Sequence, residues 1–231
     1  MSEFEVEALL LSLKVALTAV VWLIPVGILL AWVLAKKNFF GKQLLDSIIH
    51  LPLVLPPVVI GYLLLVTMGK QGIIGSFLSK TLGVSFSFSW KGAALASAVV
   101  ALPLMVRAIR LSLENVDSKL EQAARTLGAS PFKVFYTITL PLTIPGIVTG
   151  TMLSFARSLG EFGATISFVS NIPGETQTLP LAMYTFIETP GAEASAARLC
   201  VISIGVALIS LFVSEWLTRR TQKRLGYGKV T

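Results

Sequence analysis

The chain has 231 residues, of which 54% are hydrophobic and only 13% are charged, about half the charged fraction of an average soluble domain. Its mean hydropathy of +0.80 excludes a soluble globular domain, because a chain of this length has no interior large enough to hide so much apolar surface. The net charge of +7 comes from basic residues beside apolar runs, so membrane topology explains it better than nucleic-acid binding. The single cysteine, Cys200, excludes an intrachain disulfide and a cysteine-cluster metal site.

Five segments are apolar and long enough to cross a hydrocarbon core, which needs about 20 residues of helix. These segments are 9–34, 51–68, 92–112, 142–168 and 196–217. We therefore predict an all-α, polytopic membrane protein with about five transmembrane helices in one domain, residues 1–231. The second segment starts with Pro52, Pro56 and Pro57, which predicts a broken first turn. This break lies either near a pathway or helix contact, or at the membrane boundary.

Five spans place the two termini on opposite sides of the membrane. If the N-terminus is outside, the inner segments hold 13 of the 19 basic residues, including the five in the C-terminal tail. Positive charge gathers on the inner side of membrane proteins. The sequence therefore predicts an outer N-terminus and an inner C-terminus, with the polar segment between the third and fourth spans inside.

This polar segment, residues 117–141, begins with a short helix. Ser118 and Glu121 fit a capping box, with Ser118 as the N-cap. Gly128 is placed to end the helix in a left-handed conformation. One face of the helix would consist of Leu120, Ala123, Ala124 and Leu127.

A second short helix follows in the same segment. Ser130 and Pro131 fit an N-cap and a first helical residue. The helix would continue to Leu140, and Pro141 would mark its boundary with the fourth span. Two helices joined by a tight turn indicate a docking surface, although an ordinary amphipathic helix on the membrane would show the same pattern.

The spacing of this segment resembles the coupling motif of ABC-importer permease subunits: Glu-x-Ala-Ala, three residues, Gly, nine residues, Ile-x-Leu-Pro. The motif residues in this chain are Glu121, Ala123, Ala124, Gly128, Ile138, Leu140 and Pro141. Residues 51–61 and 155–165 are similar to the sulfate/molybdate branch of these permeases. Agreement from about residue 9 to 215, together with the short length, is greatest with the molybdate permeases of that branch. Sulfate permeases are usually longer and carry an extra N-terminal span.

The resemblance implies a type I importer permease fold and a homodimer in the bacterial inner membrane. It implies that residues 117–141 sit in a groove of a cytoplasmic ABC ATPase homodimer, which uses ATP and Mg, and that a periplasmic molybdate-binding protein supplies the substrate. Membrane lipid and a second copy of the chain are the other expected partners, and nucleic acid is not. No catalytic residue, metal or cofactor is expected in the chain itself, which has no Walker-type phosphate loop. Tungstate and sulfate remain alternative substrates.

Three residues in the fourth segment are candidates for the translocation path or gate: Arg157, Ser158 and Glu161. A charge near the middle of a span costs about 2.5–3.5 kcal/mol, so such residues usually face the bundle interior. Arg157 and Glu161 are four residues apart and can pair on one helix face. Arg157 would attract a passing oxyanion, or the pair would be a structural contact between subunits. Gly160 and Gly163 would permit close helix approach.

Two other function classes compete with a transport permease. A membrane-embedded enzyme would need convergent acid–base or metal groups, and its candidates are Asp46, His50, Arg157 and Glu161, which show no metal-ligand spacing. A scaffold would recruit a cytoplasmic partner through residues 117–141 without transporting anything. Stimulation of a partner ATPase by an extracytoplasmic binding protein distinguishes a permease from a scaffold.

Overall fold

The structure is a computed structural model that describes the backbone of residues 2–224 and their side chains except those of 82, 214 and 221–224. Every regular element in this part of the chain is a helix, which confirms the all-α prediction. The end of the basic tail, including Lys229, lies outside the described residues.

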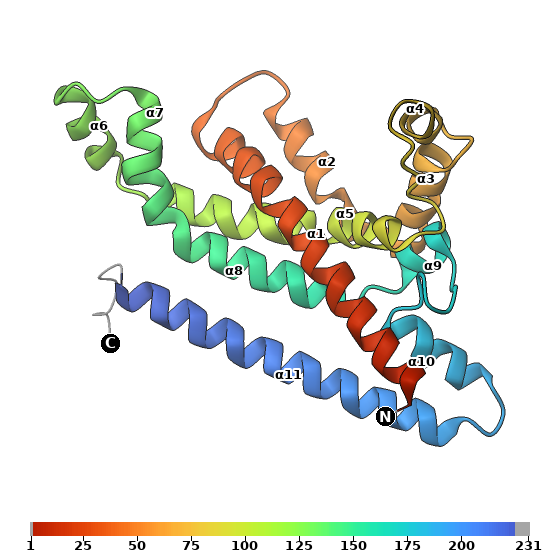
Figure 1. The fold of residues 1–231 in the computed structure, drawn as a ribbon. Helices are drawn as coiled ribbons and strands as arrows, with labels where there is room; N and C mark the ends of the chain where they lie inside the picture. Colours follow the sequence, from red (N-terminus) through yellow and green to blue (C-terminus); the bar gives the residue numbers. More distant parts are fainter. Residues whose placement is uncertain (1, 225–231) are drawn as a thin grey trace.

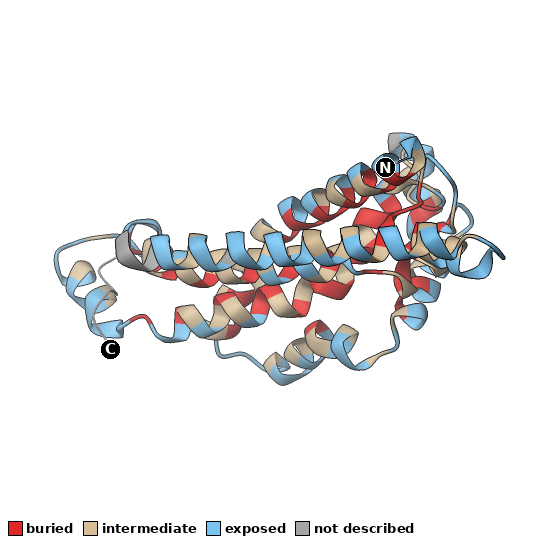
Figure 2. Ribbon diagram, turned by 90° about the horizontal axis from the view of Figure 1, so that it is seen from below, coloured by how far each residue is buried: buried red, intermediate tan, exposed pale blue. Residues whose placement is uncertain are grey.

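Four long helices form the body of the protein (Figure 1): α1 (Glu3–Lys36), α5 (Trp90–Glu114), α8 (Leu140–Leu159) and α11 (Glu193–Arg224). α5 lies at the centre and packs against α1 and α8. It is rich in alanine, and Ala93, Ala96 and Ala101 are fully buried, so neighbouring backbones approach it closely. α11 packs on α8 along one side but remains largely exposed, as Figure 2 shows. The predicted segments 9–34, 92–112 and 196–217 lie within α1, α5 and α11.

The second predicted span, 51–68, is not one helix. α2 (Lys42–Val54) and α3 (Pro57–Met68) meet at an angle of 116°. The bend lies at Leu55 and Pro56, which are both extended, with ψ of 142° and 132°. Each of them precedes a proline, and the proline ring disfavours the helical conformation of the residue before it. Pro52 instead lies inside α2, so the predicted break exists but not in the first turn.

The fourth predicted span, 142–168, is also not one helix. α8 ends at Leu159, residues 160–162 are not helical, and α9 (Gly163–Val169) follows. Gly160 and Phe162 adopt non-helical backbone conformations at this break. The number of long apolar helices in the described part of the chain is therefore four, or five if α2 and α3 together count as one bent span.

Pro141 does not mark a helix boundary, contrary to the prediction. α7 (Pro131–Val134), the π-helical turn η1 (Phe135–Thr139) and α8 form one continuous helix through it. The Leu140 N–H donates to the Phe135 carbonyl five residues back, as in a π-helix. This wider turn immediately precedes Pro141, whose ring would clash with the carbonyl four residues back in a regular α-helix.

Short helices lie at the two ends of the bundle (Figure 1). α6 (Ser118–Thr126) and α7 lie at the same end as the last turns of α11. The N-terminus lies at the opposite end, together with α4 (Ile73–Leu82), α9 and α10 (Leu179–Glu188). α4 and α10 both lie between predicted spans, in parts of the chain for which no helix was predicted.

The two helix breaks pack against each other through glycines of α3 and α9. A Cβ atom added at Gly61 would lie 2.5 Å from the Ala164 carbonyl oxygen, and one added at Gly163 would lie 2.9 Å from Pro57 Cβ. Gly163 therefore permits close helix approach as expected. Gly160 does not, because its added Cβ would meet only the Ala156 carbonyl, 4.0 Å away.

We predict that Gly61→Ala lowers the stability of the protein by about 1–3 kcal/mol, because overpacking must move backbone rather than a flexible side chain. Thermal unfolding of the detergent-solubilised protein measures the effect. Gly205→Ala in α11 is the matched control, since its added Cβ meets no described atom within 4 Å. Equal melting temperatures for the two variants would contradict the close α3–α9 contact.

Candidate functional site

Helix α6 is capped by Asp117, not by Ser118. The Asp117 carboxylate accepts a hydrogen bond from the Lys119 N–H at 2.9 Å, and Ser118 is the first helical residue. The predicted capping box of Ser118 and Glu121 is therefore wrong. Asp is as good an N-cap as Ser and adds a negative charge at the positive end of the helix dipole. The side chain of Glu121 is thereby free to interact elsewhere.

The turn that ends α6 depends on Gly128. Its φ is +83°, in the left-handed region, as predicted. The Gly128 N–H donates to the Arg125 carbonyl and the Ala129 N–H donates to the Ala124 carbonyl, both at 3.0 Å. These two bonds form a Schellman motif, which needs a residue at positive φ. Ser130 then caps α7 by accepting from the Lys133 N–H at 3.3 Å, and Pro131 is the first helical residue, both as predicted.

The apolar side of α6 is not covered by the rest of the described chain. Leu127 is 89% exposed and Leu120 is 49% exposed, while Ala123 is exposed and Ala124 half-buried. Phe132 and Tyr136 are also exposed, on the helix that follows the turn, with their ring centroids 4.6 Å apart. We call the exposed residues Leu120, Ala123, Leu127, Phe132 and Tyr136 the α6–α7 apolar surface.

Glu121 holds α6 to two other elements. Its Oε1 lies 2.9 Å from Nζ of Lys36, the last residue of α1, and accepts a hydrogen bond from the Thr139 hydroxyl at 2.7 Å. Thr139 is the last residue of η1, which leads directly into α8. The other motif residues of this region, Ile138, Leu140 and Pro141, are half-buried where η1 joins α8. No local sequence pattern indicates Lys36 or Thr139, because their contact with Glu121 depends on tertiary structure.

These partners change the acidity of Glu121. Burial alone would raise the pKa of its carboxyl, but the hydrogen bonds from the Lys36 ammonium and the Thr139 hydroxyl hold the pKa below its ordinary value of 4.5. A carboxyl with a lowered pKa in the folded state contributes stability that is fully present above 4.5. That contribution is lost as the pH falls through the lowered pKa.

The predicted path residues lie at the other end of α8. Arg157 Nη1 is 2.7 Å from Glu161 Oε2, so the predicted pair forms. Glu161 is buried and lies just beyond the end of α8, and its Oε1 accepts a hydrogen bond from the Ala164 N–H at 2.7 Å. Glu161 thus joins α8 to the first turn of α9. The buried Ser158 hydroxyl has no hydrogen-bond partner among the described residues.

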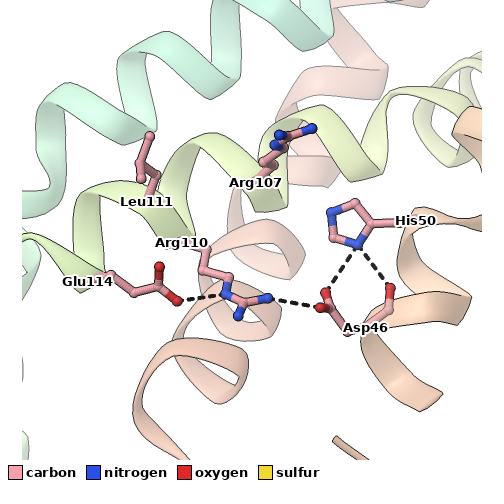
Figure 3. A pocket seen from close by; sticks show the side chains of 6 residues that line it. All are labelled: Asp46, His50, Arg107, Arg110, Leu111 and Glu114. Atoms are coloured by element: carbon pink, nitrogen blue, oxygen red, sulfur yellow. Dashed lines mark hydrogen bonds and ion pairs between the residues drawn. The ribbon is translucent and has the colours of Figure 1, made fainter. Parts of the chain in front are cut away.

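The two remaining candidates for acid–base chemistry, Asp46 and His50, lie in a separate pocket of about 380 Å³ between α2 and α5 (Figure 3). Asp46 contacts Nδ1 of His50 at 3.1 Å and Nη1 of Arg110 at 3.0 Å, and Arg110 also pairs with Glu114. Arg107 lines the same pocket. Among the described residues no group of three or more His, Cys, Asp or Glu side chains could hold a metal ion.

Comparison with known proteins decides the family. A family model described as "Binding-protein-dependent transport system inner membrane component" matches residues 24–223. This chain belongs to that family. The long apolar helices of the described residues agree with its place as an inner membrane component of such a transport system.

The chain is 66% identical to the "Molybdenum transport system permease protein ModB" of Haemophilus influenzae, over 98% of this chain and 99% of that protein. It is also 66% identical to the protein of the same name from Escherichia coli K12, over 96% and 97% of the two chains. The fold resembles the crystal structure of a bacterial ABC transporter involved in import of the polysaccharide alginate, with a TM-score of 0.75, 18% identity, and 95% and 80% of the two chains covered. The predicted ABC-importer permease fold is thereby confirmed.

We predict that the Lys36–Glu121 pair stabilises the position of α6 by about 1 kcal/mol at neutral pH, since the pair is only partly exposed. A double-mutant cycle with Lys36→Met and Glu121→Gln measures this coupling from thermal unfolding. Lys119→Met is the control, because Lys119 has no ion pair among the described residues. The coupling should vanish when the pH falls below the lowered pKa of Glu121, and a pH-independent coupling would contradict this origin.

Proposed function

We propose that this chain is the permease subunit of an importer that carries molybdate across the bacterial inner membrane. The proposal for the substrate is supported by the 66% identity, over almost the whole length, with two proteins named molybdenum transport permeases. Tungstate and sulfate are also tetrahedral dianions, so competition between the three ions for uptake by the reconstituted importer tests the substrate. Uptake of molybdate is the expected result, and an importer that takes up sulfate but not molybdate would refute the proposed substrate.

ATP hydrolysis belongs to a partner in this proposal, a cytoplasmic ABC ATPase homodimer that uses ATP and Mg. The α6–α7 apolar surface is the observation that carries the proposal, because the chain itself leaves it exposed. Ala123 lets a partner approach the α6 backbone closely, while Leu127 and Phe132 supply the apolar area that docking needs. The chain itself needs no metal or cofactor for this role.

Movement of the ATPase would reach the membrane through one continuous helix. The helix Pro131–Leu159 has no break. It begins just after the turn at Gly128 and contains Arg157 near its other end. The α8 part alone is about 30 Å long, at 1.5 Å per residue. Glu121 ties α6 to two long helices, through Thr139 to α8 and through Lys36 to α1. A push on α6 would therefore be shared between two spans.

A second copy of the chain and a periplasmic molybdate-binding protein complete the proposed assembly. Closed symmetric pairs are the commonest oligomers, and a pathway would form between two copies. The proposed orientation has the N-terminus periplasmic and α6 and the C-terminus cytoplasmic. It is supported by the distribution of basic residues and by the position of the N-terminus at the opposite end from α6 (Figure 1).

Docking is tested by adding a charge to the α6–α7 apolar surface. We predict that Leu127→Glu abolishes co-purification with the ATPase and leaves the permease folded, since Leu127 is almost fully exposed. Gln122→Glu is the matched control, because it adds the same charge on the opposite side of α6. Normal ATPase recovery and molybdate uptake with Leu127→Glu would refute docking at this surface.

The orientation is tested by cysteine labelling in a Cys200→Ser background. We predict that Ser2→Cys reacts with a membrane-impermeant thiol reagent added to intact spheroplasts. Asn115→Cys, which is exposed just before α6, should react only after the membrane is opened. The reverse pattern would place α6 outside the cell and remove its access to an ATPase.

We also propose that Arg157, Ser158 and Glu161 line the translocation path, where Arg157 would attract the oxyanion. Arg157→Gln/Glu161→Gln removes both charges, and the side-chain amide oxygen introduced by Glu161→Gln can still accept the Ala164 N–H. We predict a folded, assembled complex that has lost more than about tenfold of its uptake, because a hydrogen bond to a charged group contributes about 1.5–3 kcal/mol.

The charge-exchanged variant Arg157→Glu/Glu161→Arg serves as a comparison. An arginine side chain has no acceptor for the Ala164 N–H, so this variant should be less stable than the double glutamine variant even though it keeps opposite charges. Full uptake by the double glutamine variant would show that the pair has a structural role only.

A further inference from the structure

Helix α4 has an exposed apolar side that packing within the described chain does not use. Ile73 is 88% exposed and Phe77 is 64% exposed, and Ile74 is also exposed. The opposite side of the helix packs on the end of α3, because Gly75 lies against the carbonyls of Met68 and Gly69 too closely for any side chain. α4 is therefore held with Gly75 toward the protein and with Ile73 and Phe77 directed away from it.

The direction of α4 differs from that of the spans. In Figure 1 α4 is seen end-on, whereas α1, α5, α8 and α11 run across the view. Its axis is thus roughly perpendicular to the long helices, and therefore roughly parallel to the plane of a membrane that those helices cross. It lies at the end of the bundle where the N-terminus is found and packs against α3, of which Tyr62 and Val66 are themselves exposed.

The charged residues of the segment that contains α4 have a single sign. Residues 69–91 contain three lysines, Lys70, Lys80 and Lys91, and no acidic residue. Lys80 is three residues after Phe77 and seven after Ile73, so it borders the exposed apolar side. Lys70 lines a pocket of about 480 Å³ between the end of α3 and the segment before α5, together with Gln71, Ser87 and Phe88.

We propose that α4 lies in the membrane surface as an interfacial helix, with Ile73 and Phe77 among the acyl chains and Lys70 and Lys80 bound to the phosphates of anionic phospholipids. An amphipathic helix parallel to the membrane, with lysines beside its apolar side, binds an interface by these two contributions. The pocket beside Lys70 accommodates one headgroup. This anchoring fixes the outer end of α3, and it does not depend on which ion the protein transports.

The test measures the depth of α4 in a bilayer. Spin labels are placed at Phe77→Cys, or Ile73→Cys as a second position, and at Ser79→Cys, all in a Cys200→Ser background of the full chain. Ser79 is the matched control, since it is exposed on the same helix but lies away from Phe77. The protein is placed in nanodiscs of phosphatidylcholine alone or mixed with phosphatidylglycerol.

In the anionic nanodiscs, the label at Phe77 should collide with oxygen several-fold more often than with an aqueous nickel complex, and the label at Ser79 should show the reverse. Removing phosphatidylglycerol, or introducing Lys70→Gln/Lys80→Gln, should move the Phe77 label toward water. Equal water exposure at both positions would overturn the proposal. So would a Phe77 label that leaves water only when an extracytoplasmic binding protein is added, which would make α4 a protein-docking helix.

Discussion

The carboxylate of Glu121 is the contact on which the arrangement of α6 depends. No residue of this nine-residue helix is buried, so packing alone cannot fix its position. A half-buried carboxylate needs polar partners, because an unpaired charge away from water is costly. Glu121 has two, Lys36 from α1 and Thr139 from η1. These two contacts fix the orientation of the helix, so that its apolar residues remain exposed.

The interior of the bundle follows a second constraint, which is that backbone groups at membrane depth need hydrogen-bond partners. Two breaks interrupt the helices, at Leu55–Pro56 and at residues 160–162. The two breaks lie together, since a Cβ atom added at Gly163 would lie only 2.9 Å from Pro57 Cβ. Irregular backbone is tolerated in membranes where protein covers it. Glu161 satisfies one of the freed N–H groups at the start of α9, and Arg157 neutralises the carboxylate that does so.

Most of the fold could be predicted from the length of the hydrophobic segments, and most of the turn between α6 and α7 from local chemistry. Gly128 and Ser130 act where the sequence placed them, because helix ends depend on a few neighbouring residues. The errors have two physical origins. A hydropathy average over a window of residues does not detect a break such as Gly160 to Phe162, because the residues on both sides of the break are apolar. The partners of Glu121 come from distant positions, so a local pattern assigned it to a capping box, although Asp117 is the residue that caps the helix.

Two short helices, α6 and α4, both expose apolar residues at opposite ends of the bundle, yet their side chains differ in a way that distinguishes their partners. The exposed side of α6 combines Leu127 with the small Ala123, so another protein can reach its backbone and pack closely. The exposed side of α4 carries the bulky Ile73 and Phe77 with Lys80 beside them. Fluid acyl chains need no shape complementarity, whereas anionic headgroups attract a positive charge that lies beside the apolar side of a helix. The same amphipathic pattern therefore suits the protein partner proposed for α6 at one end and the lipid proposed for α4 at the other.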